Sequence, residues 1–470
     1  MQQSTFLKDE TPEVTPENLG EALQQAIDIE ISTIPAYLYT YYSVNRVPVQ
    51  NAIQGQLVQE LIGRGMDVMQ AGGVALGLSA QVMVFANKVG ATIMSVVMEE
   101  MLHLALSSNL KQALAGQPLM TGRSPSSYPA ELPGHVPPLK INLAPFSLNQ
   151  LKTFLSIEMP QTTPDAEMLA LPIPFHTIGE FYGMIQECIE KNDLPYDTAR
   201  PQLVPGKRYY SPNSIDTVYY DIQHKPQYMD ADDSGDLVEV LDRDSAKQAI
   251  HNIVTQGEGN TGAPIFNPDD PASCEHIMNA GFDDPARQEP SHYEKFAMLY
   301  CEYQELSKQF TSQGFDADIG TYFVYNVPTN PTTAAYPDAG VTGLDGTRFP
   351  EGTLPAVSTL LNAVYTYIFL MTEACYQQGN GNTQFEIFMF GIHKSMIFIL
   401  DALCGEIRSL TYASEGQTYN AAPTFENYSF GPRSSPKQQI VDLYNAAVKL
   451  SPGLNYLGQR INDLPDVSLA

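Results

Sequence analysis

The chain has 470 residues and a formal net charge of −28 at pH 7. Its length accommodates two or three domains, or one large domain with insertions, and an apolar fraction of 43% supports a sizeable core. Only 25 lysines and arginines stand against 53 acidic residues, so the chain lacks the excess of positive charge that binds nucleic acids and anionic membranes. We therefore expect neither as a partner.

The sequence gives no sign of export or membrane insertion. The opening MQQSTFLKDETPEV has no basic region followed by an apolar one, so no secretory signal is expected there. The most apolar stretch, LLNAVYTYIFLMTEACY, contains Asn362, Thr366 and Glu373 and is predicted to be a core helix, not a membrane span. The five cysteines are widely spaced, form no CxxC pair, and are predicted to be reduced core thiols of a cytoplasmic protein. They are Cys188, Cys274, Cys301, Cys375 and Cys404.

Helical periodicity dominates the chain. The first helix is expected to start at a Thr15 cap, with Pro16 at the first helical position, and to run past Pro35. Further helices are predicted at about 51–71, 88–115, 146–159, 177–192, 243–259, 291–306, 354–377, 383–411 and 436–450. A small strand pair is predicted in RYYSPNSIDTVYYDI, within an insertion at about 195–240. A second insertion, rich in Asn, Asp and Pro, spans about 260–290.

These elements predict a mainly α fold in two parts. Residues 1–310 form a helical bundle interrupted by the two insertions, and residues 311–470 form an irregular linker and a C-terminal helical extension packed on that bundle.

One carboxylate stands out in the first helix. Glu30 shares its helix face with apolar and aromatic side chains, at Leu23, Ile27, Ile34 and Tyr37. Burying an unpaired carboxylate costs several kcal/mol or forces it to take a proton. Glu30 is therefore predicted to face a positively charged partner inside the protein.

The stretch VVMEEMLHLAL carries a second such group. Glu100 and His103 lie one helical turn apart on an apolar face, while Glu99 also lies within a turn of His103, and helix geometry alone does not separate the two glutamates. A Glu-x-x-His pair on a core helix places a carboxylate and an imidazole on one cation, as in di-iron and di-manganese bundles. Two other readings stay open: a metal-free polar network in the core, and a misjudged helix face.

Several segments, taken in order, resemble a known family. They are QAIDIEISTIPAYLYTYYS, EEMLHLALSSNLKQALAGQP, HTIGEFYGMI, AIHNIVTQGEG and SHYEKF, followed by NVPTNPTTAAYP and AAPTFENYSF. As an ordered set they resemble the iminophenyl-pyruvate dimer synthase family and cover about three quarters of the chain. The resemblance implies a ferritin-like four-helix bundle with a metal centre, in a family named for imine-dimer formation.

The resemblance also implies a ligand set. Carried over by position, the metal ligands are Glu30, Glu100, His103, Glu180, Glu258 and His292. Four carboxylates and two imidazoles form the ligand set of a two-metal site, which suits two iron ions, with manganese or another divalent metal as the alternative. One departure from the expected pattern is that Gly259 and a long loop separate Glu258 from His292, so their helix has to break beside the site.

Weaker candidates accompany these six residues. Glu158, near the Pro160 stop, is considered but not assigned to the ligand set. His176, one turn before Glu180, is a candidate for bonding the ligands, whereas His393 is expected to be a core histidine. Glu187 is predicted to lie at a solvated helix end, and the tyrosines after Glu30, starting with Tyr37, are expected to bond the ligands or to pack the helices.

The function expected from this ligand set is a di-iron oxidoreductase or imine-coupling synthase that acts on a small organic substrate, such as an aromatic imino acid, in secondary metabolism. The alternatives are a non-catalytic metal-binding protein and a metal-free helical scaffold. No residue is assigned a catalytic role, and a homodimer is compatible with the sequence.

Overall fold

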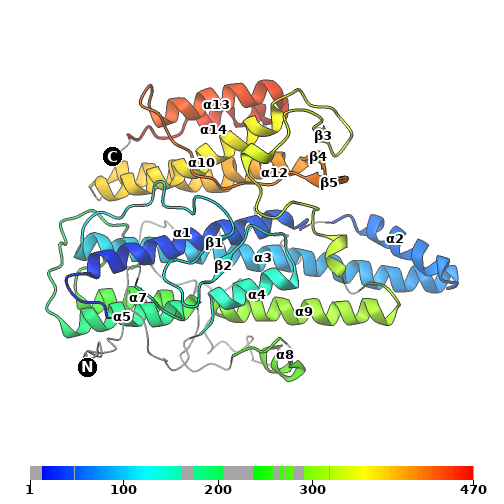
Figure 1. The fold of residues 1–470 in the computed structure, drawn as a ribbon, viewed down its shortest axis with the longest axis horizontal. Helices are drawn as coiled ribbons and strands as arrows, with labels where there is room; N and C mark the ends of the chain where they lie inside the picture. Colours follow the sequence, from blue (N-terminus) through cyan, green and yellow to red (C-terminus); the bar gives the residue numbers. More distant parts are fainter. Residues whose placement is uncertain are drawn as a thin grey trace, which may run out of the picture.

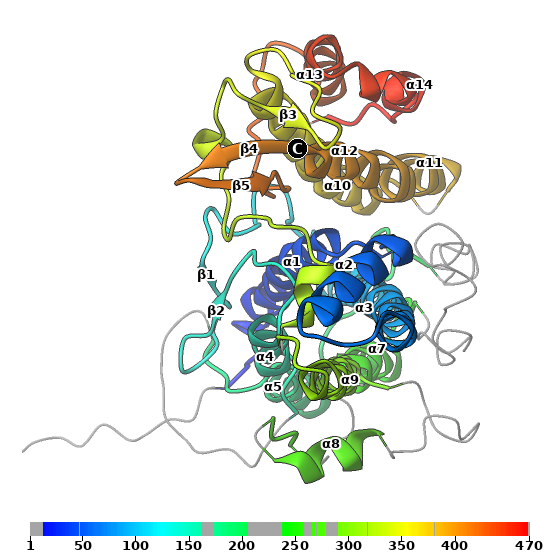
Figure 2. The ribbon, with the colours of Figure 1, turned by 90° about the vertical axis from the view of Figure 1, so that its right-hand side faces the viewer.

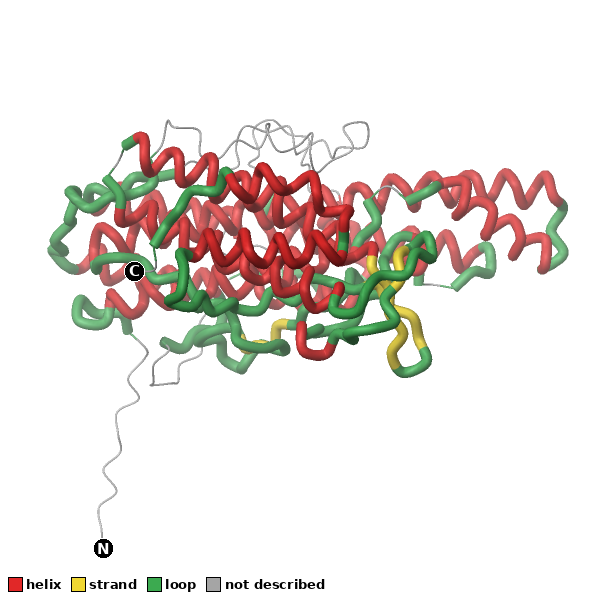
Figure 3. Tube along the Cα trace, turned by 90° about the horizontal axis from the view of Figure 1, so that it is seen from above, coloured by secondary structure: helices red, strands yellow, loops and turns green. Residues whose placement is uncertain are grey.

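The computed structural model describes residues 13–46, 48–160, 173–204, 237–257, 265–268, 270–278, 290–316, 318–379 and 381–468. Most of the trace is helical, and strands are confined to short pieces (Figure 3). This confirms the predicted mainly α fold. The strand pair predicted in RYYSPNSIDTVYYDI lies outside the described residues.

A bundle of long helices forms the lower layer in Figure 1. Its two continuous members are α1 (Leu19–Ser43) and α3 (Val68–Leu114), which pack along each other. Helix α1 begins after a turn at residues 16–18, later than the Thr15 cap predicts, and continues unbroken through Pro35. Helix α2 (Gln50–Gly63) folds back on the long N-terminal part of α3, which starts at the Asp67 cap, and both helices extend to one end of the molecule (Figure 1).

The other two rods of the bundle are each made of two helices. One contains α4 (Leu148–Ile157) and α5 (Ile178–Lys191), and the other contains α7 (Arg243–Gly257) and α9 (His292–Ser312). The helices of each pair follow one another along the long axis (Figure 1), with α4 packed on α9 and α5 packed on α7. Both interruptions lie in the middle of the bundle, beside the polar residues of α1 and α3.

Local capping explains where α5 and α9, the later helices of the two divided rods, begin. Thr177 accepts the backbone N–H of Glu180 at the start of α5. Ser291 and Glu294 form a reciprocal capping box at the start of α9, so that His292 is the first residue of that helix. Each cap satisfies backbone donors that a helix beginning inside the protein would otherwise leave unpaired.

A second layer of helices covers α1 (Figures 1 and 2). It contains α10 (Thr353–Gln377), α11 (Asn382–Glu386), α12 (Asp401–Ser409), α13 (Pro436–Leu450) and α14 (Gly458–Asn462). Two π-helical stretches, Ile387–Ile392 and Ser395–Leu400, join α11 to α12. Hydrogen bonds tie the layers together: the Gln112 side chain donates to the Tyr376 carbonyl, and Glu373 accepts from the backbone of Thr121 at 2.7 Å.

Short segments complete the described structure. Strands β1 (Ala130–Glu131) and β2 (Lys140–Ile141) pair antiparallel beside the bundle. Strands β3 (Thr342–Gly343), β4 (Leu410–Ser414) and β5 (Gln417–Asn420) form a second antiparallel sheet in the order β3-β4-β5. The short 3₁₀ helices in the connections are Ile319–Tyr322, Thr333–Ala335 and Pro452–Leu457.

Three apolar helices bear on the expectations that the chain has no membrane span and no membrane partner. By length and composition, stretches in Val68–Leu114, Thr353–Gln377 and Asn382–Ser409 could each cross a membrane, so composition alone does not exclude α10. In α10, however, 83% of the apolar window is buried within the protein, which favours a core helix. In α3 the corresponding figure is 33%. The absence of a membrane partner therefore stays a prediction.

The cysteine prediction was wrong for one pair. Cys274 of α8 (Pro271–Met278) and Cys301 of α9 form a disulfide. Sequence spacing did not reveal the bond because the two residues are 27 positions apart and meet only when α8 folds onto α9. Cys188, Cys375 and Cys404 are free and buried, as predicted.

Candidate metal centre

Five polar side chains meet where the two divided rods are interrupted. They are Glu30 of α1, Glu100 and His103 of α3, Glu158 at the C-cap of α4, and His292 at the start of α9. None is more than 3% exposed. We call these five residues the carboxylate–histidine centre. Burial on this scale needs a compensating positive charge, since three carboxylates removed from water repel one another.

Glu100 occupies the middle of the centre. Its Oε1 lies 3.0 Å from Nδ1 of His292 and 3.5 Å from Nδ1 of His103. The other two carboxylates lie one on each side: Glu30 Oε2 is 3.9 Å from Nδ1 of His103, and Glu158 Oε2 is 3.6 Å from Nδ1 of His292. The imidazole rings stack with their centroids 5.2 Å apart. The centre therefore has two halves that share the Glu100 carboxylate.

Each carboxylate is held by a hydroxyl group through one oxygen. Tyr182 donates to Glu30 Oε1 at 2.7 Å, Thr33 donates to Glu100 Oε2 at 2.6 Å, and Tyr37 donates to Glu158 Oε1. The other oxygen of each carboxylate is the one turned towards an imidazole Nδ1. This arrangement fixes the rotamers of all three acids and leaves one oxygen of each available for a cation.

The outer nitrogens of the imidazoles define the tautomers. Nε2 of His103 lies 3.0 Å from Oε1 of Gln256, and Nε2 of His292 lies 2.7 Å from Oε2 of Glu99. Both partners are acceptors, so we assign the hydrogen of each neutral ring to Nε2. Nδ1 then carries the lone pair that a metal requires, and it faces the carboxylates.

The residues present fit a metal ion. Nδ1 of His292 is buried without a hydrogen-bond partner, although a Glu100 oxygen lies 3.0 Å away. Ligand atoms of Glu100, His103 and His292 all lie within 4.8 Å of one another. Lone pairs that converge in a dry interior repel unless a cation or protons lie between them, and oxygen and imidazole donors suit iron, manganese or zinc.

The ionisation of the centre reflects this crowding. Burial, and next the neighbouring Glu100 carboxylate, raise the pKa of Glu30 well above 4.5. For His292, burial lowers the pKa, but the carboxylates of Glu158, Glu100 and Glu99 outweigh it and raise the pKa well above 6.5. Burial also opposes the ionisation of Glu99, but the Lys295 ammonium and the His292 imidazole together outweigh burial and lower the pKa of Glu99 to about 2. Without metal, the centre therefore retains protons that a bound cation would replace.

These pKa directions predict how the metal-free protein responds to pH. A raised pKa in the folded state stabilises the protein at low pH, and that stabilisation is lost as pH rises above about 4.5 for Glu30 and about 6.5 for His292. Chelator-treated protein should melt at a lower temperature at about pH 8.5 than at about pH 5.5. In Glu30→Gln the difference should shrink, because the variant side chain does not titrate. An unchanged difference in that variant would show that Glu30 does not contribute to the effect and would leave His292 and the acidic surface as its sources.

The ligands expected from sequence are not all brought together. Glu30, Glu100, His103 and His292 belong to the centre, whereas Glu180 lies at the start of α5 and accepts the His176 backbone N–H at 2.7 Å. Tyr182, two residues further, is the residue of this helix that reaches Glu30, and positions two apart point in nearly opposite directions on a helix. Helix geometry therefore directs Glu180 away from the centre.

Four further candidates from the sequence lie away from the centre or outside the described residues. Glu258 lies outside the described residues, although Gly257 before it is close to the centre, since a Cβ there would lie 3.4 Å from Glu158 Oε2. His176 donates from Nδ1 to the Val136 carbonyl at 2.7 Å and does not join the centre. Glu187 is exposed and pairs with Lys191, and His393 lies between the two π-helical stretches of the upper layer.

Sequence reasoning underestimated three groups at the centre. Glu158 supplies the carboxylate of the rod formed by α4 and α5. Glu99 and Gln256 orient the imidazoles of His292 and His103, respectively. A signal for Glu180 was available: Thr177 and Glu180 form the T-x-x-E pattern of a helix N-terminus. That pattern predicts a capping role for Glu180. Because Glu187 and Glu190 pair with lysines near the far end of α5, Glu158 is left as the acid of the α4–α5 rod that reaches the centre.

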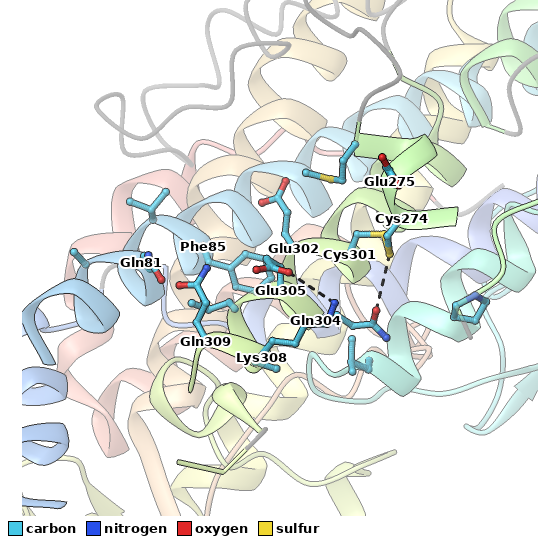
Figure 4. A pocket seen from close by; sticks show the side chains of 17 residues that line it. Gln81, Phe85, Cys274, Glu275, Cys301, Glu302, Gln304, Glu305, Lys308 and Gln309 are labelled. Carbon is cyan, nitrogen blue, oxygen red and sulfur yellow. Dashed lines mark hydrogen bonds and ion pairs between the residues drawn. A yellow bond between two sulfur atoms is a disulfide. The ribbon is translucent and has the colours of Figure 1, made fainter. Parts of the chain in front are cut away.

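The cavity drawn in Figure 4 is separate from the centre. It has a volume of about 1170 Å³ and lies between α3, α8 and α9, with Phe85, Glu302 and the Cys274–Cys301 disulfide in its lining. Phe85 precedes Glu100 by fifteen residues on the same helix, which corresponds to about 22 Å. The cavity therefore does not open onto the carboxylate–histidine centre.

Comparisons with known proteins agree with this architecture. A family model described as Ferritin-like matches residues 23–301. The chain is 23% identical over 463 residues to dichlorochromopyrrolate synthase of Lentzea aerocolonigenes, covering 92% of this chain and 38% of that protein. It is 25% identical over 252 residues to 2-imino-3-(indol-3-yl)propanoate dimerase of Chromobacterium violaceum, covering 51% of this chain and 21% of that protein. The chain thus spans less than half the length of either curated relative.

A solved structure of a ferritin like protein from Caulobacter vibrioides is also similar, at 18% identity and a TM-score of 0.42, covering 88% of this chain and 99% of that chain. The family match includes α1, α3 and both divided rods up to Cys301, and therefore every residue of the carboxylate–histidine centre. More than half of the chain is matched, and the bundle carries the inward-facing acids and histidines typical of this fold. The chain belongs to the ferritin-like family.

Proposed function

We propose that this protein is a two-metal oxidoreductase-type enzyme, with iron as the favoured metal, that acts on a small aromatic imino acid. The observation that carries the proposal is the geometry of the carboxylate–histidine centre: three acids, each held by a hydroxyl through one oxygen, turn the other oxygen towards two imidazole Nδ1 atoms. The substrate class is suggested by the names of the two curated relatives. One is a dimerase of 2-imino-3-(indol-3-yl)propanoate, which is an aromatic imino acid, and the other is a synthase of dichlorochromopyrrolate.

In this proposal each half of the centre holds one ion. Glu30 and His103 would bind the first, Glu158 and His292 the second, and Glu100 both. Glu258, outside the described residues, stays a predicted sixth ligand. When bound, an iron pair would supply one-electron redox chemistry and Lewis acidity.

The protein's own groups would keep this chemistry selective. The five ligands are buried, so bulk water is kept from the centre. Tyr182 lies between Glu30 and Ser107, 2.7 Å from each, and forms a short hydroxyl chain that could hold a proton beside the first half. Tyr37 packs against Phe154 and Phe296 while it bonds Glu158, which fixes that acid beside the second half.

Metal content and reaction with oxygen test the proposal. Protein purified from iron-supplemented culture should contain close to two irons per chain, and the anaerobically reduced form should change its visible absorption on exposure to air. Iron without any spectral change would favour a non-catalytic metal-binding protein. Absence of bound metal after reconstitution with Fe²⁺ or Mn²⁺ would leave only the metal-free scaffold.

A further inference from the structure

The two imidazoles of the centre have different hydrogen-bond partners at Nε2, the ring nitrogen that is turned away from Glu100. His103 Nε2 faces the neutral amide oxygen of Gln256 at 3.0 Å, whereas His292 Nε2 faces the Glu99 carboxylate at 2.7 Å. Lys295 binds both oxygens of Glu99, at 2.9 and 2.8 Å. Lys295 is 0% exposed and Glu99 is 4% exposed. A buried ion pair thus supports only one of the two halves that the described residues form.

The position of this pair in the fold makes it a rigid support. Lys295 lies three residues after His292 on α9 and shares its face, and Glu99 lies next to Glu100 on α3. The pair therefore joins α3 and α9, two of the three helices that deliver the ligands of the second half. Lys295 balances the charge of Glu99, which would otherwise be buried with only the His292 imidazole as its partner.

A carboxylate behind a metal-bound imidazole has a known chemical effect. It draws on the Nε2 hydrogen and increases the electron density at Nδ1, so the ring binds a cation more strongly than one that donates to a neutral amide. Loss of such a partner typically weakens metal binding about 10–100-fold. The two halves should therefore differ in affinity even though each combines one imidazole with carboxylates.

We propose that Glu99 and Lys295 are positioning residues that make the His292 half the tighter of two metal positions and the first to be loaded. The inference rests on the proposed function, because it requires the carboxylate–histidine centre to bind two ions. It goes further in ranking the halves and in assigning the difference to residues that do not touch the metal.

Titration of the full-length, chelator-treated chain with Mn²⁺ tests the inference, by calorimetry and by electron paramagnetic resonance of free Mn²⁺. The wild type should show two binding events with unequal constants. Glu99→Gln should weaken the tighter event about 10–100-fold and leave the weaker event in place. Because Glu99→Gln leaves Lys295 without its anion, Glu99→Gln combined with Lys295→Met provides a charge-balanced variant, and it should show the same loss.

The chain offers a matched control. Lys88 of α3 and Glu302 of α9 form a second lysine–glutamate pair between the same two helices, twelve residues and about 18 Å along α3 from Glu100. Glu302→Gln should leave both Mn²⁺ constants unchanged. If it weakened binding as Glu99→Gln does, the effect would come from the helix–helix contact and the inference would be overturned.

The remaining outcomes separate the inference from the proposed function. Two equal constants in the wild type, or equal loss of both events in Glu99→Gln and in the charge-balanced variant, would overturn the loading order while keeping a two-metal protein. No Mn²⁺ binding by the wild type would contradict the proposed function itself and, with it, the inference.

Discussion

Replacement of Glu100 by alanine is expected to remove nearly all bound metal, to less than about a tenth of the wild-type content, because its carboxylate lies between both imidazoles. His103→Ala should lose about half of the bound metal, since it removes the nitrogen donor of the His103 half and leaves the donors of the tighter His292 half in place. Elemental analysis of the purified variants, reported per folded chain, measures the effect. No other residue of the centre is replaced in either variant, so the loss can be attributed to the missing donor.

His393→Ala is the control for these variants. His393 lies in the upper helical layer, between the two π-helical stretches, and not in the bundle that holds the centre. Its metal content should equal that of the wild type. Stoichiometric iron in His103→Ala, equal to that of the wild type, would show that the imidazole is a packing residue and would contradict its assignment as a metal ligand.

Substitutions at Glu158 and at Glu180 are expected to have opposite effects on metal content, although both residues belong to the rod formed by α4 and α5. Glu158→Gln should lose at least half of the bound metal, because one Glu158 oxygen faces His292 Nδ1 at 3.6 Å and a neutral amide is a weaker ligand. Glu180→Gln should keep its metal and lose about 1 kcal/mol of stability at most, since Glu180 bonds the backbone N–H of His176 at a helix N-terminus. Metal analysis and chemical denaturation of the two variants provide the comparison.

The reverse pattern, with metal lost in Glu180→Gln and retained in Glu158→Gln, would restore the ligand set that family resemblance implies. It would require α5 to rotate, because Tyr182 of that helix now reaches Glu30. A Tyr182→Phe variant would report such a rotation, since it removes the hydroxyl that fixes Glu30 without altering the ring.

The break in each divided rod has a structural consequence for the centre. Glu158 is available because α4 ends there, and His292 because α9 begins there behind its capping box. A residue at a helix end has more freedom of approach than one in mid-helix, where the side chain must follow the helix surface. The bundle thus uses two helix ends to complete a centre that its two continuous helices begin.

The sequence by itself determined the features that depend on local periodicity. The positions of most helices, the burial of Glu30, and the pairing of Glu100 with His103 on one face all follow from spacing along a single helix. The ferritin-like resemblance was carried by short segments within these same helices, and the family match over residues 23–301 confirmed it. Such signals survive in the sequence because they repeat every three or four residues.

The tertiary structure alone decided which distant groups meet. Helix spacing left Glu99 and Glu100 open, and family resemblance favoured Glu100. That Glu100 faces both imidazoles depends on the position of α9, and the place of Glu158 depends on where α4 ends. Lys295 and the Cys274–Cys301 disulfide likewise join residues from different helices. Contacts of this kind are set by the crossing and termination of packed helices, and the spacing of residues within one helix contains no information about them.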